Sequence, residues 1–363
     1  MSVSRVMKAM RVHEFGSVES LKEDEIQTPR PGPGEALVQV HAVGVNRMDV
    51  ELRAGIYGHE SLLDFYFGQM IEFPHTPGIE PAGVVVALGD GVTDVAVGDR
   101  VVPHAHLSCG TCRSCLAGQD NACPRIQVLG VQTPGVGGYA EYFVWPAHLL
   151  IPLPDTVGYE KAAALLVNYG PVWTALVERA KVRPGDTILV TGATGGCGYA
   201  AIEVGLLAGA RVLALGGDDD KLAELERAGA EPIDYRGGFS EAVSKATNGE
   251  GADVVLELVG ATTFAEAIGC AGSLGRIAVI GSHGGIRAQL NLGLLFAMNL
   301  QIHGVTRASQ ATMRKVVRLA GEGKLNPKIW RTLPLSEAGE AHRLMDERQH
   351  SGKIVLTVDT LQD

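Results

Sequence analysis

The sequence lacks any stretch of 18 apolar residues, and its first residues, Met1–Arg5, carry no apolar signal-peptide core. We therefore expect neither a membrane-spanning helix nor a secretory leader, and a cytoplasmic protein is the default. No basic run offsets the formal net charge of −10, which argues against nucleic acid or an anionic membrane as a partner. Internal repeats and low-complexity tracts are also missing.

The remaining composition is that of an ordinary globular chain, with 46% hydrophobic and 20% charged residues. A length of 363 residues favours two domains with sizeable cores. Four of the six cysteines fall within fifteen positions, between Cys109 and Cys123. In a reducing compartment such clustering indicates metal binding rather than disulfides.

A glycine-rich segment, Val190–Gly198, stands between an apolar run, Thr187–Val190, and a helical stretch, Tyr199–Leu207. The run predicts a buried parallel strand. Strand, glycine turn and helix in this order form a seat for the pyrophosphate of a dinucleotide. We expect Gly195 to allow close approach of phosphate and Gly198 to allow tight packing of helix on strand.

Because Ala193 replaces the first glycine of the G-x-G-x-x-G pattern, an ordinary tight turn is the alternative. The context favours the dinucleotide site, since strands and helices alternate after the turn and predict a doubly wound parallel sheet. The predicted elements are strands at 211–215, 232–235, 253–258, 276–280 and 301–305 and helices at 220–228, 239–247 and 262–271.

The first part of the chain has a different pattern, with short strands and glycine turns up to about Pro154. This pattern predicts barrel-like β structure, and the change near Asp155–Glu160 predicts a domain boundary. We expect the residues before Met10 to form a loose leader. The tail, with helices at 308–321 and 336–347 and a strand at 353–357, is expected to return to the first domain.

At this point the chain resembles the medium-chain dehydrogenase/reductase superfamily over nearly its whole length. The motifs that carry the resemblance are the cysteine loop, Pro77–Glu80, Gly138–Tyr142, Arg183–Asp186 and Gly195–Gly198. The resemblance implies an α/β protein with a GroES-like β-barrel catalytic domain at 1–157 and 306–363. It further implies a Rossmann domain at 158–305, with the active site in the cleft between the two.

The cysteine loop has the spacing C-x2-C-x2-C-x7-C. Four thiolates at short spacing close a tetrahedral shell around zinc and leave no open position, which is typical of a structural site. The spacing resembles the structural-zinc lobe of zinc alcohol dehydrogenases, here at about 104–126; four unligated thiols are the alternative. The predicted ligands are Cys109, Cys112, Cys115 and Cys123. Cys197 and Cys270 are expected to be small packing residues.

The resemblance also places three ligands of a catalytic zinc, at positions occupied here by Asn46, Ile79 and Val167. Because isoleucine and valine cannot bind a metal, we expect no catalytic zinc. Alcohol oxidation then loses the metal that would stabilise an alkoxide. Hydride transfer to an enone, enal or quinone needs only a hydrogen-bond donor for the developing oxyanion. The chain therefore resembles the quinone-oxidoreductase and enoyl-reductase branch.

Two residues are candidates for that donor. Asn46 is expected to face the nicotinamide, and Tyr57 matches a tyrosine that lines the substrate pocket in the resembled enzymes. Asp49 and Glu80 match acids near the zinc site, and we expect them to hold Arg47 or backbone groups.

The end of the second predicted strand bears on the choice of cofactor. Gly216 and Gly217 stand where NAD-specific sites carry an acid. Lys221 resembles the lysine that meets the 2′-phosphate in NADPH-dependent quinone oxidoreductases, with Tyr235 expected to flank the phosphate; a Lys221 that faces solvent is the alternative. NADPH is therefore favoured over NADH, although Asp218–Asp220 would repel a phosphate. The predicted cofactor-binding residues are Gly195, Gly196, Cys197, Gly198, Gly216, Lys221, Tyr235 and Gly281.

The segment Leu62–Ile71 is rich in aromatic residues, and it predicts either a wall for an apolar or aromatic substrate or a local packing cluster. We expect strand Arg276–Ile280 at the edge of the sheet, where the resemblance implies a homodimer, with a tetramer left open. The leading function is an NADPH-dependent reductase of activated C=C bonds or quinones. The alternatives are a carbonyl reductase or alcohol dehydrogenase that uses hydrogen bonding alone and a non-catalytic nucleotide-binding protein.

Overall fold

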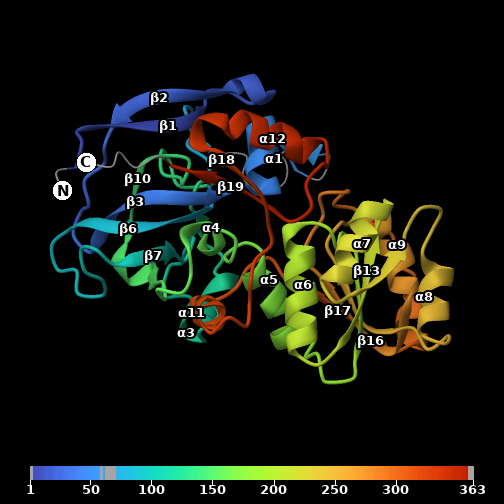
Figure 1. Ribbon diagram of the computed structural model, residues 1–363. Coiled ribbons are helices and arrows are strands. Elements are labelled where there is room, and N and C mark those ends of the chain that lie inside the picture. The colour runs from blue at the N-terminus through green and yellow to red at the C-terminus, as the bar shows by residue number, and fades with distance from the viewer. Residues whose placement is uncertain (1–2, 58–59, 62–70, 359–363) are drawn as a thin grey trace.

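The structure, a computed structural model, describes residues 3–57, 60–61 and 71–358, with the backbone alone at 57, 60 and 61. Figure 1 shows a mainly β part beside an α/β part built around a twisted sheet. Within these ranges no helix has the length and apolar character needed to cross a membrane. The aromatic segment at 62–70 and the side chain of Tyr57 lie outside the described residues.

Six strands of the α/β part form a parallel sheet in the order β14-β13-β12-β15-β16-β17. They are β12 (Thr187–Val190), β13 (Arg211–Gly216), β14 (Glu231–Asp234), β15 (Ala252–Glu257), β16 (Ala271–Val279) and β17 (Gln301–Gly304). Counted from β12, the order is 3-2-1-4-5-6, which is that of a doubly wound dinucleotide-binding sheet. The predicted Rossmann sheet is thus confirmed, and its strand order reverses between β12 and β15.

Helices connect the successive strands, as parallel pairing requires. They are α6 (Gly196–Leu207), α7 (Asp219–Arg227), α8 (Ser240–Ala246), α9 (Ala261–Gly269) and α10 (Leu292–Ala297). Strand β12 shows why the apolar run is continuous. Ile188 and Val190 belong to one hydrophobic cluster and Leu189 to another, because successive side chains point to opposite faces and both faces are covered.

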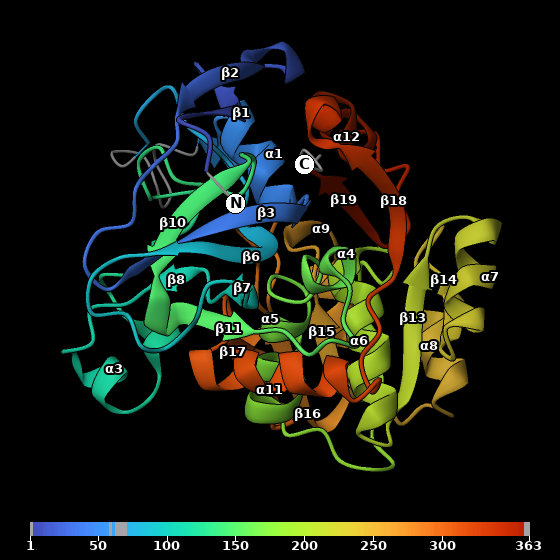
Figure 2. The ribbon, with the colours of Figure 1, turned by 60° about the vertical axis from the view of Figure 1, so that its left-hand side comes forward.

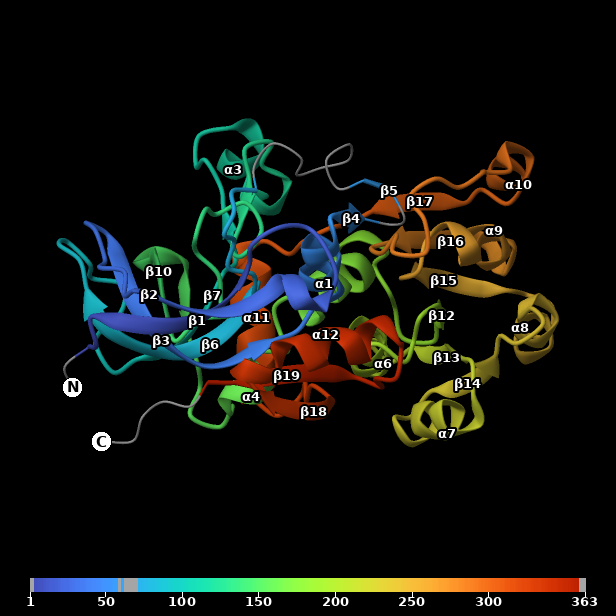
Figure 3. The ribbon, with the colours of Figure 1, turned by 90° about the horizontal axis from the view of Figure 1, so that it is seen from above.

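The predicted edge strand is wrong. Strand β16 pairs with β15 on one side and with β17 on the other, so β17 is the edge. The burial explains the difference: Ile277 and Ala278 are fully buried, whereas Gln301 and Ile302 of β17 are exposed. A short strand that is partly polar is typical of a sheet edge. Figure 3 shows β17 and α10 on one side of the sheet, with β14 and α7 on the opposite side.

The β part contains a seven-stranded sheet with the path β11-β7-β6-β3-β19-β18 and with β10 also paired to β3. Its strands are β3 (Glu35–Gly44), β6 (Glu80–Leu88), β7 (Arg100–Pro103), β10 (Tyr142–Pro146), β11 (Leu150–Pro152), β18 (Ile329–Pro334) and β19 (Lys353–Thr357). The last two strands come from the tail, and Val355 of β19 lies opposite Gly44 of β3. The predicted return of the tail is confirmed, although β18 was not predicted.

The prediction of a loose leader before Met10 is wrong. Strand β1 (Val6–Val12) pairs along its length with β2 (Leu21–Gln27). The side chains of Met7 and Ala9 are buried, and the N–H of Met10 donates to the carbonyl of Tyr139 at 2.8 Å. The alternation of buried and exposed residues in this segment is that of a half-buried strand, and it extends to within a few residues of the chain start.

Shorter elements complete the described part of the chain. They are η1 (Val18–Ser20), α1 (Arg47–Ala54), β4 (Ile56–Tyr57), β5 (Glu60–Ser61), β8 (His106–Leu107), α3 (Arg113–Leu116), η2 (Asp120–Ala122), β9 (Gln127–Val128), η3 (Ala147–Leu149), α4 (Tyr159–Ala162), α5 (Tyr169–Trp173), the π-helix η4 (Thr174–Arg179), α11 (Gln310–Gly321), η5 (Leu335–Glu337) and α12 (Ala338–Asp346). The domain limits at 157/158 and 305/306 stay a prediction.

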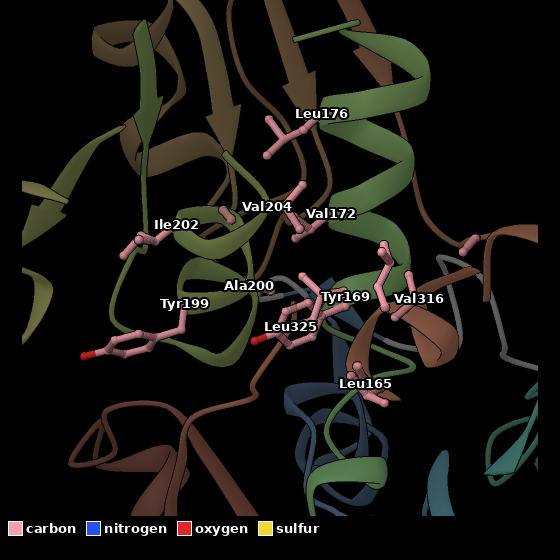
Figure 4. Packing of buried hydrophobic residues seen from close by; sticks show 14 of the residues in the cluster. Leu165, Tyr169, Val172, Leu176, Tyr199, Ala200, Ile202, Val204, Val316 and Leu325 are labelled. Atoms are coloured by element: carbon pink, nitrogen blue, oxygen red, sulfur yellow. The ribbon is translucent and has the colours of Figure 1, made fainter. Parts of the chain in front are cut away.

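One hydrophobic cluster joins the two sheets. It contains Ala42 of β3 and Val190 of β12, and between them the side chains of α5 and α6 pack together. Figure 4 shows Tyr169 and Val172 of α5 beside residues of α6, with Val316 of α11 on the other side. The barrel sheet and the nucleotide sheet therefore share a core, which fixes the position of the glycine turn relative to α1.

Candidate active site and cysteine cluster

The glycine turn connects β12 to α6. A Cβ on Gly198 would lie 2.1 Å from the carbonyl oxygen of Ala193, so no side chain fits where the helix packs against the turn. Gly195 is different, because the nearest atom to an added Cβ would be the carbonyl oxygen of Gly192 at 3.7 Å. The turn is thus closed on its packed side and open above Gly195, as a phosphate seat at a helix N-terminus requires.

The C-terminal tail runs alongside this turn, which the sequence did not indicate. Gly195 and Gly352 form a parallel β-bridge, and the N–H of Gly352 donates to the carbonyl of Thr194 at 2.9 Å. Gly352 has φ +109°, and a Cβ there would lie 2.8 Å from the carbonyl oxygen of Lys328. A glycine is therefore required where the tail passes the turn.

Asn46 stands at the start of α1 and is 5% exposed. Its backbone N–H donates to Asp49 Oδ2 at 2.9 Å, and Asp49 Oδ1 accepts from the N–H of Gly78 at 3.1 Å. Burial raises the pKa of Asp49 to about 6, so the carboxylate form still dominates at neutral pH. Asp49 thus fixes the start of α1 against Gly78, which agrees with the backbone role expected for it.

Glu80 has a partner that the sequence did not predict. Its side chain is fully buried, and its Oε2 accepts from the ammonium of Lys353 at 2.6 Å. The same ammonium donates to Asn46 Oδ1 at 2.5 Å. Arg47, the partner considered for Glu80, instead pairs with Asp346 at 3.0 Å. The signal in the sequence was Lys353, a lysine at the first position of an apolar strand. Nothing in the sequence indicated that its partner is Glu80.

The three positions matched to catalytic-zinc ligands meet around Glu80. Asn46 Nδ2 lies 3.4 Å from Glu80 Oε2, the N–H of Val167 donates to Glu80 Oε1 at 2.9 Å, and Ile79 precedes Glu80 in the chain. Two of the three carry hydrocarbon side chains, which offer no metal ligand. The expected lack of a catalytic zinc stays a prediction that rests on these donors.

Val167 also connects this group to the glycine turn. The thiol of Cys197, in the first turn of α6, lies 3.8 Å from the carbonyl oxygen of Val167 and 3.6 Å from Asn168 Oδ1. Burial raises the pKa of Cys197 to about 11, so the thiol stays neutral. Asn168 is buried and so close to Gly196 that a Cβ there would lie 2.6 Å from its Nδ2. The predicted donor Asn46 and the predicted cofactor turn are thus neighbours.

Another buried carboxylate, that of Glu257, holds the loop after β15, beside the point where the strand order reverses. Glu257 is fully buried, and its Oε1 accepts from the N–H groups of Val259 and Gly260 at 2.7 and 2.8 Å. It also accepts from the hydroxyl of Thr191 at 3.0 Å. Gly281 closes the neighbouring strand end, since a Cβ on it would lie 2.0 Å from the carbonyl oxygen of Leu258. These contacts fix the rim of the sheet at which a dinucleotide binds.

The residues expected near a 2′-phosphate lie together at the end of β13. A Cβ on Gly217 would lie 2.3 Å from the hydroxyl of Tyr235, and Tyr235 is half exposed. Asp218 caps α7 by accepting from the N–H of Lys221 at 2.8 Å. The ammonium of Lys221 lies 3.3 Å from Asp218 Oδ2 and donates to the carbonyl of Arg348 at 3.2 Å. The tail therefore also positions Lys221.

The four cysteines of the loop form one cluster, with their sulfur atoms within 4.8 Å of one another. The Cys112 and Cys115 sulfurs are 3.5 Å apart, and those of Cys109 and Cys115 are 4.0 Å apart. A tetrahedral zinc with Zn–S bonds of about 2.3 Å needs sulfurs about 3.8 Å apart, so the donor set fits this ion. Backbone N–H groups point at the sulfurs, as in the 3.3 Å contact from Cys112 to Cys109. In Figure 2 this lobe, marked by α3, lies far from α7 and α8.

Comparison with known proteins agrees with this architecture. The family model described as alcohol dehydrogenase GroES-like domain matches residues 32–155, and the model described as zinc-binding dehydrogenase matches residues 228–356. A solved structure entitled NAD-dependent alcohol dehydrogenase is 38% identical, with a TM-score of 0.90, and covers 97% of this chain and 100% of its own. The chain belongs to the medium-chain dehydrogenase/reductase superfamily.

Two further relatives place it within that superfamily. The quinone oxidoreductase of Homo sapiens is 29% identical over 97% of this chain and 98% of its own. A crotonyl-CoA carboxylase/reductase, solved in complex with NADP, is 25% identical with a TM-score of 0.88 and covers 98% of this chain and 96% of its own. This medium-chain enzyme is an oxidoreductase of the quinone-oxidoreductase and enoyl-reductase-like branch that uses a nicotinamide cofactor and acts on a small molecule. The expected enzyme is thus confirmed over the alternative of a non-catalytic nucleotide-binding protein.

We predict that the purified enzyme contains one zinc ion per subunit, because four cysteine ligands fill one closed tetrahedral shell. Cys112→Ser should lose the ion and make the lobe at about 104–126 sensitive to protease, while cofactor binding persists. Zinc content by atomic absorption and limited proteolysis measure the two effects. Cys270→Ser is the matched control, since Cys270 is a buried cysteine outside the cluster. Zinc-free wild-type enzyme from zinc-supplemented cultures would contradict the prediction.

Proposed function

We propose that this medium-chain enzyme is an NADPH-dependent reductase that transfers hydride to an activated C=C bond or a quinone without a catalytic zinc. The observation that carries the proposal is the surroundings of Asn46. The Asn46 carboxamide contacts Glu80, Glu80 accepts from the N–H of Val167, and the carbonyl of Val167 contacts Cys197 of the glycine turn. Two of the positions matched to metal ligands, Ile79 and Val167, carry hydrocarbon side chains. Such a site can offer a hydrogen-bond donor to an oxygen, while Ile79 and Val167 offer no ligand to a Lewis acid.

The residues of the nucleotide sheet fit a dinucleotide. The open space above Gly195, at the start of α6, suits a pyrophosphate. At the end of β13, Gly217 carries no acid that would bind a ribose 2′-hydroxyl, and the Tyr235 hydroxyl lies beside it. Two of the acids near that end are engaged elsewhere: Asp218 caps α7, and Asp219 pairs with Arg236 at 2.8 Å. Lys221 is the cation closest in sequence to the predicted phosphate position, which supports NADPH.

In the proposed reaction the nicotinamide supplies the hydride, and the chain positions and stabilises the acceptor. An enone or quinone spreads the incoming electron pair onto its oxygen, where one hydrogen-bond donor lowers the energy of the oxyanion. Asn46 Nδ2 is the donor that we assign to this oxygen. Its bond to the carbonyl of Gly44, at 3.1 Å, fixes the plane of the carboxamide. The neutral thiol of Cys197 and the hydrocarbon of Val167 keep the neighbouring surface apolar.

A second function is favoured by one observation, the 38% identity to a structure entitled NAD-dependent alcohol dehydrogenase. In this reading the enzyme reduces aldehydes or ketones, with Asn46 alone polarising the carbonyl. A carbonyl is a weaker hydride acceptor than an enone when no metal polarises it, because all the charge develops on one oxygen. We therefore favour reduction of activated C=C bonds or quinones over reduction of carbonyls.

The two functions differ in the acceptors that are turned over. We expect NADPH oxidation with enones, enals or quinones and little with saturated aldehydes or with alcohols in the reverse direction. Asn46→Ala should lower kcat by about 100-fold, as expected for loss of one oxyanion donor. The measurement is initial rates by absorbance at the cofactor band across the four acceptor classes. Preferential turnover of alcohols would overturn the proposed function in favour of the second one.

The cofactor preference is tested at Lys221. Lys221→Ala should weaken the binding of NADPH by about 10-fold and leave that of NADH nearly unchanged, because a charge-assisted hydrogen bond to phosphate is lost. Fluorescence titration with each cofactor measures the effect. Lys245→Ala, an exposed lysine on α8, serves as the control. A wild-type enzyme with a clearly higher kcat/KM for NADH would count against NADPH.

We further propose a homodimer formed through the edge strand β17. This strand leaves its outer backbone groups unpaired within the sheet, and α10 beside it exposes Leu292 and Phe296, at 66% and 77%. An edge strand flanked by exposed apolar side chains is a surface that pairing with a second copy would cover.

Phe296→Asp should convert this dimer into a monomer of 38.2 kDa, because a charge would then be buried in the interface. Light scattering after size-exclusion chromatography measures the mass. Leu116→Asp is the control, since Leu116 is 76% exposed and lies on α3 of the cysteine lobe, not on β17 or α10. A wild-type monomer at micromolar concentration would refute the proposed assembly.

A further inference from the structure

We propose that Lys353 is a positioning residue of the active site: its ammonium holds the Oδ1 of Asn46 and neutralises Glu80, so that Asn46 can donate to the substrate oxygen. The inference rests on the proposed reductase function and deepens it, because it identifies the group that makes Asn46 a donor. Lys353 acts through Asn46 and is not assigned any contact with the substrate.

The burial of Lys353 is the first observation. The residue is 3% exposed, and its ammonium lies between Asn46 Oδ1 at 2.5 Å and Glu80 Oε2 at 2.6 Å. A lysine is seldom this buried unless it is paired, because removing its charge from water is costly. The pair lies where the barrel meets the nucleotide sheet. If packing were the sole requirement at position 353, an apolar residue would meet it, so the charge points to another role.

The direction of the Asn46 carboxamide follows from this ammonium. A lysine has three donors and no acceptor, so it must face the carboxamide oxygen rather than the nitrogen. Nδ2 is thereby turned toward the carbonyl of Gly44, at 3.1 Å, and toward Glu80 Oε2, at 3.4 Å. The second distance is longer than that of a good hydrogen bond. One hydrogen of Nδ2 is bonded to the carbonyl of Gly44. The other makes only a weak contact with Glu80, so it can form a hydrogen bond to a substrate oxygen instead.

Lys353 also changes the charge that the substrate oxygen meets. Glu80 is fully buried near Asn46, and an uncompensated carboxylate there would oppose a developing oxyanion. It would also draw the weakly held hydrogen of Nδ2 to itself. With Lys353 on Oε2 and the N–H of Val167 on Oε1, both carboxylate oxygens are occupied. The ammonium thus brings a positive charge beside Ile79 and Val167, whose side chains offer no metal ligand.

The backbone fixes where this charge lies. The N–H of Lys353 donates to the carbonyl of Lys328 at 2.9 Å, and the N–H of Val45 donates to the carbonyl of Ile354 at 3.0 Å. The side chain passes over Gly44, since a Cβ on that glycine would lie 2.7 Å from Lys353 Cε. Strand β19 is therefore anchored on both sides of the site, and the lysine has one direction in which to extend.

The kinetic test uses Lys353→Met and the double variant Lys353→Met/Glu80→Gln. We expect Lys353→Met to lower kcat for an enone or quinone by about 100-fold, the effect of misplacing a group at a reacting centre, and to change the Kd of NADPH far less. The double variant should have a kcat about tenfold higher than that of Lys353→Met, because the opposing carboxylate of Glu80 is gone. It should stay below the wild-type kcat, because Asn46 Oδ1 still lacks its hydrogen-bond donor. The double variant leaves no unpaired charge in the core, so it serves if the single variant does not fold.

Lys328→Met is the matched control. Lys328 is also a lysine bound to a glutamate, Glu224, at 2.5 Å, but this pair contacts Tyr199 and Ser351 and not Asn46. The Lys328→Met enzyme should be less stable than the wild type but should keep its kcat. A Lys353→Met enzyme with wild-type kcat, or one whose only defect is weaker NADPH binding, would overturn the inference, and so would a double variant no faster than the single one.

A second readout does not depend on turnover. In a crystal structure of Lys353→Met, we expect the Asn46 side chain to move toward Glu80, with the amide-to-carboxylate distance falling from 3.4 Å to an ordinary hydrogen bond. An unmoved Asn46 side chain would overturn the positioning role. If the wild-type enzyme reduced no enone or quinone, the proposed function would fail, whereas this structure would still decide what Lys353 does.

Discussion

A buried ion pair, Lys353–Glu80, is the contact on which the arrangement of this enzyme depends. Buried charges are tolerated only in pairs with good geometry, so the two residues must be brought together whenever the chain is folded. They come from strands β19 and β6, and Asn46 of α1 completes the group. Gly352, the residue before β19, forms a β-bridge with Gly195 of the glycine turn, so this segment contacts both the barrel and the nucleotide sheet.

This pair also bears on how the dehydrogenase fold could support hydride transfer when the positions matched to catalytic-zinc ligands carry other residues. Ile79 and Val167 offer no metal ligand, and in the proposed mechanism the positive charge near the reacting oxygen comes from the ammonium of Lys353. Glu80 is the carboxylate that balances this ammonium. Glu80 fills that role while its second oxygen holds the N–H of Val167, so the carboxylate is both counter-ion and structural support. The Cys109–Cys123 loop lies away from this chemistry.

Much of the α/β part could be predicted from the sequence, because parallel strands buried on both faces give unbroken apolar runs such as Thr187–Val190. The edge strand could not, since the order of β16 (Ala271–Val279) and β17 (Gln301–Gly304) in the sheet depends on which strands they pair with, and the sequence does not show that pairing. Strand β1 was missed because its alternation begins so close to the start of the chain. The cysteine ligands were visible from local spacing, whereas Lys353 was not, because its partners lie 273 and 307 positions away. Long-range pairing of single charges leaves no periodic signal.

The place of β19 in the chain has a consequence for biosynthesis. A ribosome releases residues in order, so the glycine turn, α1 and β6 leave the exit tunnel long before Lys353 does. Until then Glu80 has no cation, residues 42–44 of β3 lack their antiparallel neighbour, and Thr194 lacks its backbone donor. Contacts of such high sequence separation are slow to form, because the loop-closure entropy is lost before the contacts stabilise the chain. The nascent chain can therefore fold its nucleotide-binding sheet before the group around Asn46 is complete. Strand β19, which is synthesised later, supplies the missing lysine to that group.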